Sequence, residues 1–266
     1  MNSLVLCDSH VHYYKCFDVE NFLESAYENF YKQACRLGRE SDFFPMLLLS
    51  EAKHDNWFDC LKSNTANSEN WSFTATEEPE SIFATNSSGN QMVIINGRQI
   101  VTSENLEILA LATNNVLDDG KPLSSVIQWI KDQQVIPVIP WGFGKWWGKR
   151  GKILSQVLAT TISDGVFLGD NSGRPWFLGQ PKHFIQAKRD RRLILPGSDP
   201  LPFAGEERRP GSIGFYFTGF IDKARPATCL RQYLNKPEAQ VETYMHCESL
   251  LPFLKNQISM QIRNRV

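Results

Sequence analysis

The stretch Ser3-Leu4-Val5-Leu6-Cys7-Asp8-Ser9-His10-Val11-His12 decides the predicted fold. Its short apolar run, closed by Asp8, is typical of a buried parallel strand. Two histidines separated by one residue on an extended segment point to the same side of the chain. His10 and His12 can therefore face a single ion from the end of the first strand.

Strands and helices alternate along much of the remaining sequence. A helix predicted over residues 17–37 follows the first strand, and an apolar second strand follows over 43–50. Regular alternation resumes at residue 122 with the segments 122–132, 135–140, 151–160, 165–168, 181–189 and 193–195. Repeated units in this order predict a mostly parallel sheet with right-handed crossovers.

The middle of the chain has a different pattern. Alternating segments from Trp71 onward, the turn Asn86-Ser-Ser-Gly-Asn90 and the hairpin pattern Asn96-Gly97-Arg98 indicate antiparallel strands. Residues 106–111 then read as a strand that re-enters the main sheet. We therefore expect one α/β domain over residues 1–266, a distorted TIM-like (β/α)7–8 barrel with an inserted antiparallel β-hairpin region around 71–105.

Charge and composition limit the partners. The chain has 28 Lys plus Arg against 29 Asp plus Glu, a net charge of −1 that offers no overall attraction to nucleic acid or to an anionic membrane. No long apolar segment suggests a signal peptide or a membrane span. Six cysteines without CxxC pairs indicate reduced thiols. A cytoplasmic protein without a membrane partner is expected, with nucleic acid disfavoured and any charge-based recognition local.

The chain resembles metal-dependent hydrolases that begin with an HxH strand. The residues that carry the resemblance are Asp8-Ser-His-Val-His12 and Gly197-Ser-Asp199, which directly follows the strand 192–196. The first match is the polymerase and histidinol phosphatase (PHP) family, and the second is the amidohydrolase superfamily. The resemblance spans roughly residues 4–203, on the scale of a barrel domain. It implies that Asp199 is a metal ligand or a general base.

Other positions depart from the PHP pattern. His54 with Asp55 can fill the Asp-His position of the second strand, but Gln99 stands where a carboxylate is usual and Trp141 where a histidine is usual. The ligand set is thus partly degenerate. We expect one or two divalent ions, Zn or Mn, held by residues drawn from His10, His12, His54, Asp199, Glu107 and Asp170. A solvent-facing Glu107 and a turn-stabilising Asp170 are the alternatives.

The segment 141–152 joins four glycines, three tryptophans and four basic residues. Lys145, Lys149 and Arg150, together with backbone N–H groups at a helix start, can hold a phosphate. Arg174, in the polar turn that follows the strand at 165–168, is a further candidate for substrate binding. Two alternatives remain open for this segment: contact with single-stranded nucleic acid, and a lid packed on its own tryptophans.

Together these residues predict a metal-dependent hydrolase that acts on a small anionic or phosphorylated molecule, as a PHP-type phosphoesterase does. Asp199 or His54 would handle the proton while the ion activates water. The amidohydrolase resemblance implies C–N hydrolysis instead. A third hypothesis is that Gln99 and Trp141 mark a catalytically decayed barrel that binds a ligand or a protein.

Overall fold

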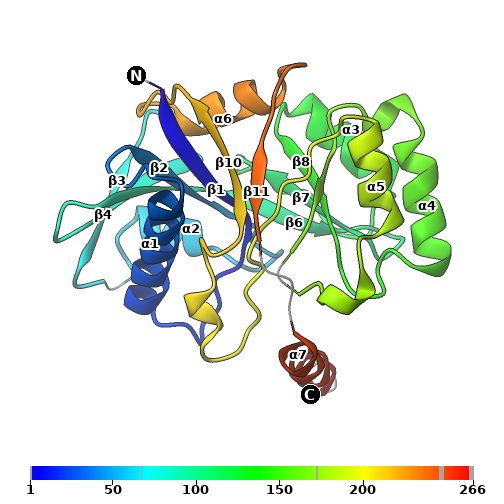
Figure 1. The fold of residues 1–266 in the computed structure, drawn as a ribbon, viewed down its shortest axis with the longest axis horizontal. Coiled ribbons are helices and arrows are strands. Elements are labelled where there is room, and N and C mark those ends of the chain that lie inside the picture. The colour runs from blue at the N-terminus through cyan, green and yellow to red at the C-terminus, as the bar shows by residue number, and fades with distance from the viewer. Residues whose placement is uncertain (1, 67, 172, 246–248, 264–266) are drawn as a thin grey trace.

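The computed structural model describes residues 2–66, 68–171, 173–245 and 249–263, which form two β-sheets with helices on their outer faces (Figure 1). The larger sheet has the strand order β11-β10-β1-β2-β5-β4-β3 and the smaller one the order β6-β7-β8-β9. The strands of the larger sheet are β1 (Ser3–Val11), β2 (Phe43–Leu49), β3 (Trp71–Ala75), β4 (Ser81–Asn86), β5 (Gln91–Ile95), β10 (Gly214–Gly219) and β11 (Glu242–Tyr244). Those of the smaller sheet are β6 (Gly97–Val101), β7 (Glu107–Leu111), β8 (Ile136–Pro140) and β9 (Phe167–Gly169).

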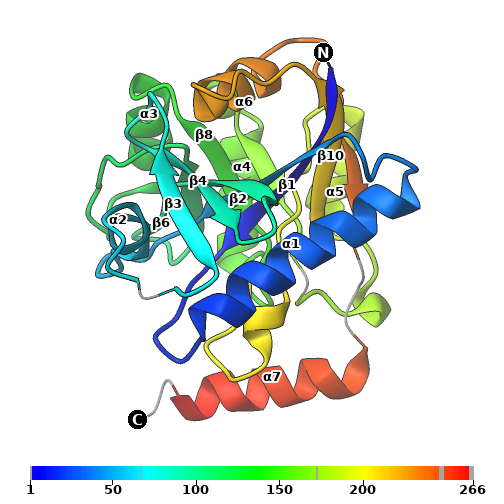
Figure 2. The same cartoon turned by 90° about the vertical axis from the view of Figure 1, so that its left-hand side faces the viewer.

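The helices divide between the two sheets and the ends of the molecule (Figures 1 and 2). They are α1 (Val19–Arg36) and α2 (Trp57–Lys62) beside the larger sheet, α3 (Leu123–Asp132), α4 (Gly148–Leu158) and α5 (Lys182–Arg189) beside the smaller sheet, and α6 (Pro226–Leu234) and α7 (Leu250–Arg263) at opposite ends. Three 3-10 turns are η1 (Thr161–Ser163), η2 (Trp176–Leu178) and η3 (Glu206–Arg208). None of the helices in the described part of the chain has the length and apolar character to cross a membrane.

Side-chain alternation on the strands explains the layers. In β1, Leu4 and Leu6 pack into the cluster that contains α1, whereas Val5 and Cys7 join a second cluster that both sheets share. In β7, the residues at alternate positions belong to that shared cluster or to the one under α3, α4 and α5. Both sheets are thus apolar on both faces, and the fold has four layers in the order α, β, β, α.

The two sheets are also linked through the main chain at two places. At one, the N–H of Glu51, just after β2, donates to the carbonyl of Gly97, and the N–H of Gln99 donates back to Glu51. At the other, segment 193–199 lies between β9 and β1: Leu195 N–H donates to Leu168 O, and Asp199 N–H donates to His10 O at 2.8 Å. These contacts bring the carboxyl ends of β1 and β2 close to β6 and to residue 199.

The predicted TIM-like barrel is wrong, because the chain builds two mixed sheets and no closed barrel. β1 pairs in parallel with β2 but antiparallel with β10, and β7 pairs antiparallel with both β6 and β8. The predicted hairpin at residues 96–98 is also wrong, since the chain leaves the larger sheet after β5 and enters the smaller sheet at Gly97. The expected antiparallel pairing does occur between β3, β4 and β5, within the larger sheet.

Gly97 should be intolerant of any side chain. A Cβ atom there would lie 2.6 Å from the carbonyl oxygen of Leu49 and 3.0 Å from that of Ala110, so the sheets would have to move apart. We expect Gly97→Ala to lower the free energy of unfolding by about 1–3 kcal/mol, the usual cost of overpacking. Denaturant unfolding measures this change. Gly173→Ala is the control, because its Cβ would meet only an ordinary contact at 3.5 Å, and an equal effect of the two variants would contradict the prediction.

Candidate metal centre

Three side chains converge at the carboxyl end of β1. The Nε2 atoms of His10 and His12 lie 3.0 Å apart, and Oδ1 of Asp199 lies 3.6 Å from the first and 3.8 Å from the second. Among the described residues, these three form the group of His, Cys, Asp and Glu side chains whose donor atoms could hold one metal ion. Two nitrogens and one carboxylate oxygen therefore face a common point.

This spacing fits a divalent ion. Donor atoms bound tetrahedrally at about 2.0–2.2 Å are separated by about 3.3–3.6 Å, close to the observed distances. Three protein ligands with a remaining open position are typical of catalytic rather than structural zinc sites. The side chains of His10 and His12 are 4% and 7% exposed, whereas that of Asp199 is 23% exposed, so the site opens to solvent beside the carboxylate.

Two further atoms bear on the fit. Oε1 of Gln99 lies 3.3 Å from Nε2 of His10, which places an additional oxygen at the edge of the centre. Nδ1 of His10 is buried and has no hydrogen-bond partner among the described residues. A buried unsatisfied nitrogen costs stability, and such a cost is usually tolerated where a group serves a function.

The Asp8 carboxylate holds the surrounding backbone in place. It is buried and accepts hydrogen bonds from the N–H groups of His10, Ser198 and Gly211, at 3.3, 2.9 and 2.8 Å. Burial raises its pKa to about 6, although these donors favour the charged form. Gly197 completes the contact, because a Cβ there would lie 2.3 Å from the backbone nitrogen of His10. The absence of a side chain at residue 197 thus lets the loop lie directly on β1.

Asp199 is held in an unusual conformation. Its φ of 45° lies in the left-handed region, which costs a non-glycine residue free energy and is often found at functional sites. Nδ2 of Asn171 donates to Oδ2 of Asp199 at 2.8 Å and also to the carbonyl of Trp141 at 2.8 Å. Asn171 therefore fixes one carboxylate oxygen and leaves Oδ1 directed at the histidines.

The protonation states of His12 and Asp199 favour the binding of a cation. Burial, and then the neighbouring His10, lower the pKa of His12 to about 4, so this imidazole is neutral near pH 7. Burial alone would raise the pKa of Asp199, but the charges of His10, His12, Lys145 and Arg209 outweigh it and the pKa is lowered. A neutral imidazole and an ionised carboxylate are the forms that bind metal.

Lys145 and Glu107 form an ion pair next to the three converging groups. Both belong to the site electrostatically, since Glu107 acts on His12 and Lys145 acts on Asp199. Glu107 lies outside the converging group and is engaged by Lys145. Glu107 is therefore the ion-pair partner of Lys145 and does not belong to the group that could hold the ion.

Several residues predicted for the site have other places in the structure. His54 is exposed in the loop before α2 and lies outside the converging group. Asp170 does not reach that group either, because Arg174 binds it through three hydrogen bonds in a buried pair. Arg174 is thereby engaged within the fold. Arg150 donates to the carbonyls of Asn105 and Gly144, and Lys149 is exposed at the start of α4.

Sequence reasoning missed the structural roles of Asp8, Asn171 and Gln99. Asp8 belongs to the quoted motif, and a buried strand that ends in an aspartate was the available indication of its role. The sequence places Asn171 in a polar turn and does not indicate its contact with Asp199. The contact of Gln99 with His10 depends on the crossing between sheets at Gly97, which no local pattern in the sequence predicted.

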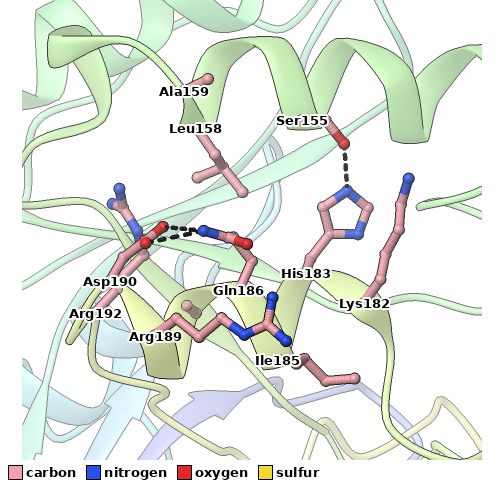
Figure 3. A pocket seen from close by; sticks show the side chains of 11 residues that line it. Ser155, Leu158, Ala159, Lys182, His183, Ile185, Gln186, Arg189, Asp190 and Arg192 are labelled. Atoms are coloured by element: carbon pink, nitrogen blue, oxygen red, sulfur yellow. Dashed lines mark hydrogen bonds between the residues drawn. The ribbon is translucent and has the colours of Figure 1, made fainter.

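The groove between α4 and α5 is a separate feature, with a volume of about 440 Å³ (Figure 3). His183 points at Ser155 there, with Nε2 2.9 Å from Oγ. The serine hydroxyl donates to the carbonyl of Gly151 at 2.8 Å, so its proton is already used and the imidazole acts as the donor. This pair joins the two helices and resembles packing rather than an activated nucleophile.

The Asp170–Arg174 pair should matter for stability in the absence of any metal. Breaking a buried pair leaves an uncompensated charge, and we expect Asp170→Asn to cost about 3–5 kcal/mol of unfolding free energy in metal-free buffer. Asp42→Asn is the matched control, because Asp42 pairs with Arg39 at the surface and such pairs contribute little. Urea unfolding monitored by circular dichroism measures both. A stable Asp170→Asn protein that loses only metal affinity would restore Asp170 as a ligand.

Comparison with known proteins shows a likeness of fold. No protein-family model and no curated protein matches the chain. Among solved structures, the crystal structure of PsfC from Pseudomonas syringae PB-5123 is similar, with a TM-score of 0.53 and 10% sequence identity over 99% of this chain and 98% of PsfC. The two chains therefore share their architecture from end to end, at an identity that speaks only for the fold.

Proposed function

We propose that the protein is a metal-dependent hydrolase whose single divalent ion, Zn or Mn, is held by His10, His12 and Asp199. The observation that carries the proposal is the convergence of their three donor atoms, at 3.0–3.8 Å, at an opening to solvent. The resemblance of Asp8–His12 and Gly197–Asp199 to the PHP family supports the same chemistry. A divalent ion in this position would act as a Lewis acid on the substrate and activate water.

The charges around the centre favour an anionic substrate, and a phosphate ester before a neutral amide. Lys145 and Arg209 both lie near enough to Asp199 to lower its pKa. Glu107 holds the ammonium group of Lys145 beside the opening, where it can donate to a phosphoryl oxygen. A C–N bond in a neutral substrate would make no use of these two cations, so the amidohydrolase-type reaction is the second candidate.

A single ion is proposed because other carboxylates are engaged. Asp170 is paired with Arg174 and Glu107 with Lys145, and neither belongs to the converging group. The binding-module hypothesis keeps the same three side chains but assigns them no turnover. Metal content and activity together distinguish it from a hydrolase.

The ligand assignment can be tested by metal binding. We expect the purified chain to bind one Zn²⁺ or Mn²⁺ per molecule, and His12→Ala or Asp199→Asn to bind it at least about 100-fold more weakly, because each removes a donor atom. His54→Ala is the matched control, since His54 is exposed and outside the group. Isothermal titration calorimetry gives affinity and stoichiometry. Equal loss in all three variants, or no binding by the unchanged protein, would refute the assignment.

Lys145 should contribute to turnover without holding the ion. With an aryl phosphate monoester, an aryl phosphate diester and an aryl amide as probes, we expect phosphate hydrolysis by the metal-loaded protein. Lys145→Met should lower kcat/KM by about 100-fold, the usual effect of losing one donor to a developing negative charge, with metal affinity retained. Lys149→Met, on the exposed start of α4, should behave like the unchanged protein. Metal binding without hydrolysis of any probe would favour the binding-module hypothesis.

A further inference from the structure

A chain of contacting aromatic rings connects α7 to two loops of the smaller sheet's side. Phe253 of α7 is buried, and its ring lies 5.0 Å from that of Phe143 and 5.9 Å from that of Phe177. Phe143 in turn contacts Trp147, and Phe177 contacts Trp176. Phe253 therefore anchors α7 between the loop that carries Lys145 and the turn η2.

The outer residues of this assembly are unusually apolar. Thirteen large hydrophobic side chains are exposed among the described residues, and nine of them belong to segment 141–147, η2 or α7. The most exposed are Leu251, at 78%, and Trp176, at 67%. A surface that gathers most of a protein's exposed apolar side chains usually serves for association.

The exposed leucines and isoleucine of α7 form one stripe. At 100° per residue, Leu250, Leu251, Leu254 and Ile258 fall within an arc of about 100° on the helix. All four are exposed, whereas Phe253 lies on the neighbouring side and is buried. We call the stripe, together with Trp147 and Trp176, the α7 face. Helix α7 thus has one apolar side that Phe253 anchors to the fold and a neighbouring apolar side that is exposed.

Exposed basic side chains lie near the α7 face. The helices α4, α5 and α7 carry Lys and Arg but no Asp or Glu within their bounds. Lys149, Lys152, Lys182 and Lys255 are exposed. Lys152 and Lys182 line a hollow with Trp147, and Lys182 continues into the groove between α4 and α5 (Figure 3). The near-zero net charge of the whole chain conceals this local positive region.

We propose that the α7 face docks on an anionic lipid surface. An amphipathic helix with a basic surround and flanking tryptophans is the arrangement that lies in the plane of a membrane interface, with leucine and isoleucine inserted and lysines near the headgroups. Each basic residue near such a surface adds to the attraction. The expectation of no membrane partner rested on the total charge and on the lack of a spanning segment, and neither bears on docking by one face.

Docking would leave the candidate metal centre close to the lipid headgroups, because Lys145 lies between Phe143 and Trp147 in the sequence and contacts Glu107. The proposal nevertheless stands without the metal, since it uses only the apolar and basic residues of the face. A second copy of this chain and a single-stranded nucleic acid are the competing occupants, and both have a distinct outcome in the experiment below.

Vesicle sedimentation tests the proposal with the intact chain of residues 1–266. We expect binding to vesicles of phosphatidylcholine mixed with phosphatidylserine, weaker binding to phosphatidylcholine alone, and a decrease with added salt. The double variant Leu251→Ser, Leu254→Ser should bind the mixed vesicles at least about tenfold more weakly, because two leucines no longer leave water. Lys149→Glu with Lys152→Glu should reduce binding mainly to the anionic vesicles.

Phe220→Ser with Lys223→Glu is the matched control. Phe220 is exposed and directly follows Gly219, which pairs with Ser3 at the start of β1, and this start of β1 lies at the end of the molecule opposite α7 (Figure 1). This pair of substitutions should therefore leave binding unchanged. Circular dichroism and thermal melting verify that every variant folds, and a blue shift of tryptophan fluorescence on adding anionic vesicles reports insertion. No binding to anionic vesicles, or equal binding by the leucine variant, overturns the proposal. A dimer in light scattering that the leucine variant abolishes, or retention of single-stranded DNA without vesicle binding, also overturns it.

Discussion

The buried carboxylate of Asp8 is the contact on which the candidate site depends. It accepts N–H groups from the end of β1, from the loop before Asp199 and from Gly211, so three distant parts of the chain meet at one side chain. A carboxylate in an apolar interior needs such donors, because desolvation would otherwise be prohibitive. The same three donors fix the backbone from which His10 and Asp199 project. The contacts that satisfy the buried Asp8 carboxylate thus also place His10 and Asp199, two of the potential metal ligands.

Other buried or half-buried acids are paired with cationic side chains. Glu51, Asp170 and Glu107 each contact an arginine or lysine, namely Arg98, Arg174 and Lys145. Asp199 instead faces two imidazoles, one of them neutral near pH 7 because burial lowers its pKa. The pKa of Asp199 is lowered, so its carboxylate is ionised near pH 7 and can bind a cation together with the neutral imidazole of His12. Among these four acids, Asp199 is therefore the one that we expect to bind a ligand.

The sequence indicated the local features of the site and missed the tertiary ones. The HxH spacing on a strand and Asp199 after a later strand were visible, and the structure brings these three side chains together. Arg174 pairs with Asp170, and Lys145 pairs with Glu107. Both pairs depend on tertiary structure, and no periodic pattern in the sequence predicts them. The barrel was wrong for a related reason: strands apolar on both faces look alike in a parallel barrel and in two stacked sheets. The two are distinguished by which strands pair, in which direction, and by whether the sheet closes.

The pairing of β1 with β10 has a consequence for biosynthesis. Residues 3–7 pair with residues 215–219, so β1 cannot complete its pairing in the sheet until β10 has been synthesised. Asn171 follows His10 by 161 residues and Asp199 follows it by 189 residues. A nascent chain therefore cannot assemble the three-donor group until Asp199 has left the ribosome. An ion that needs all three donors would be bound only after that point.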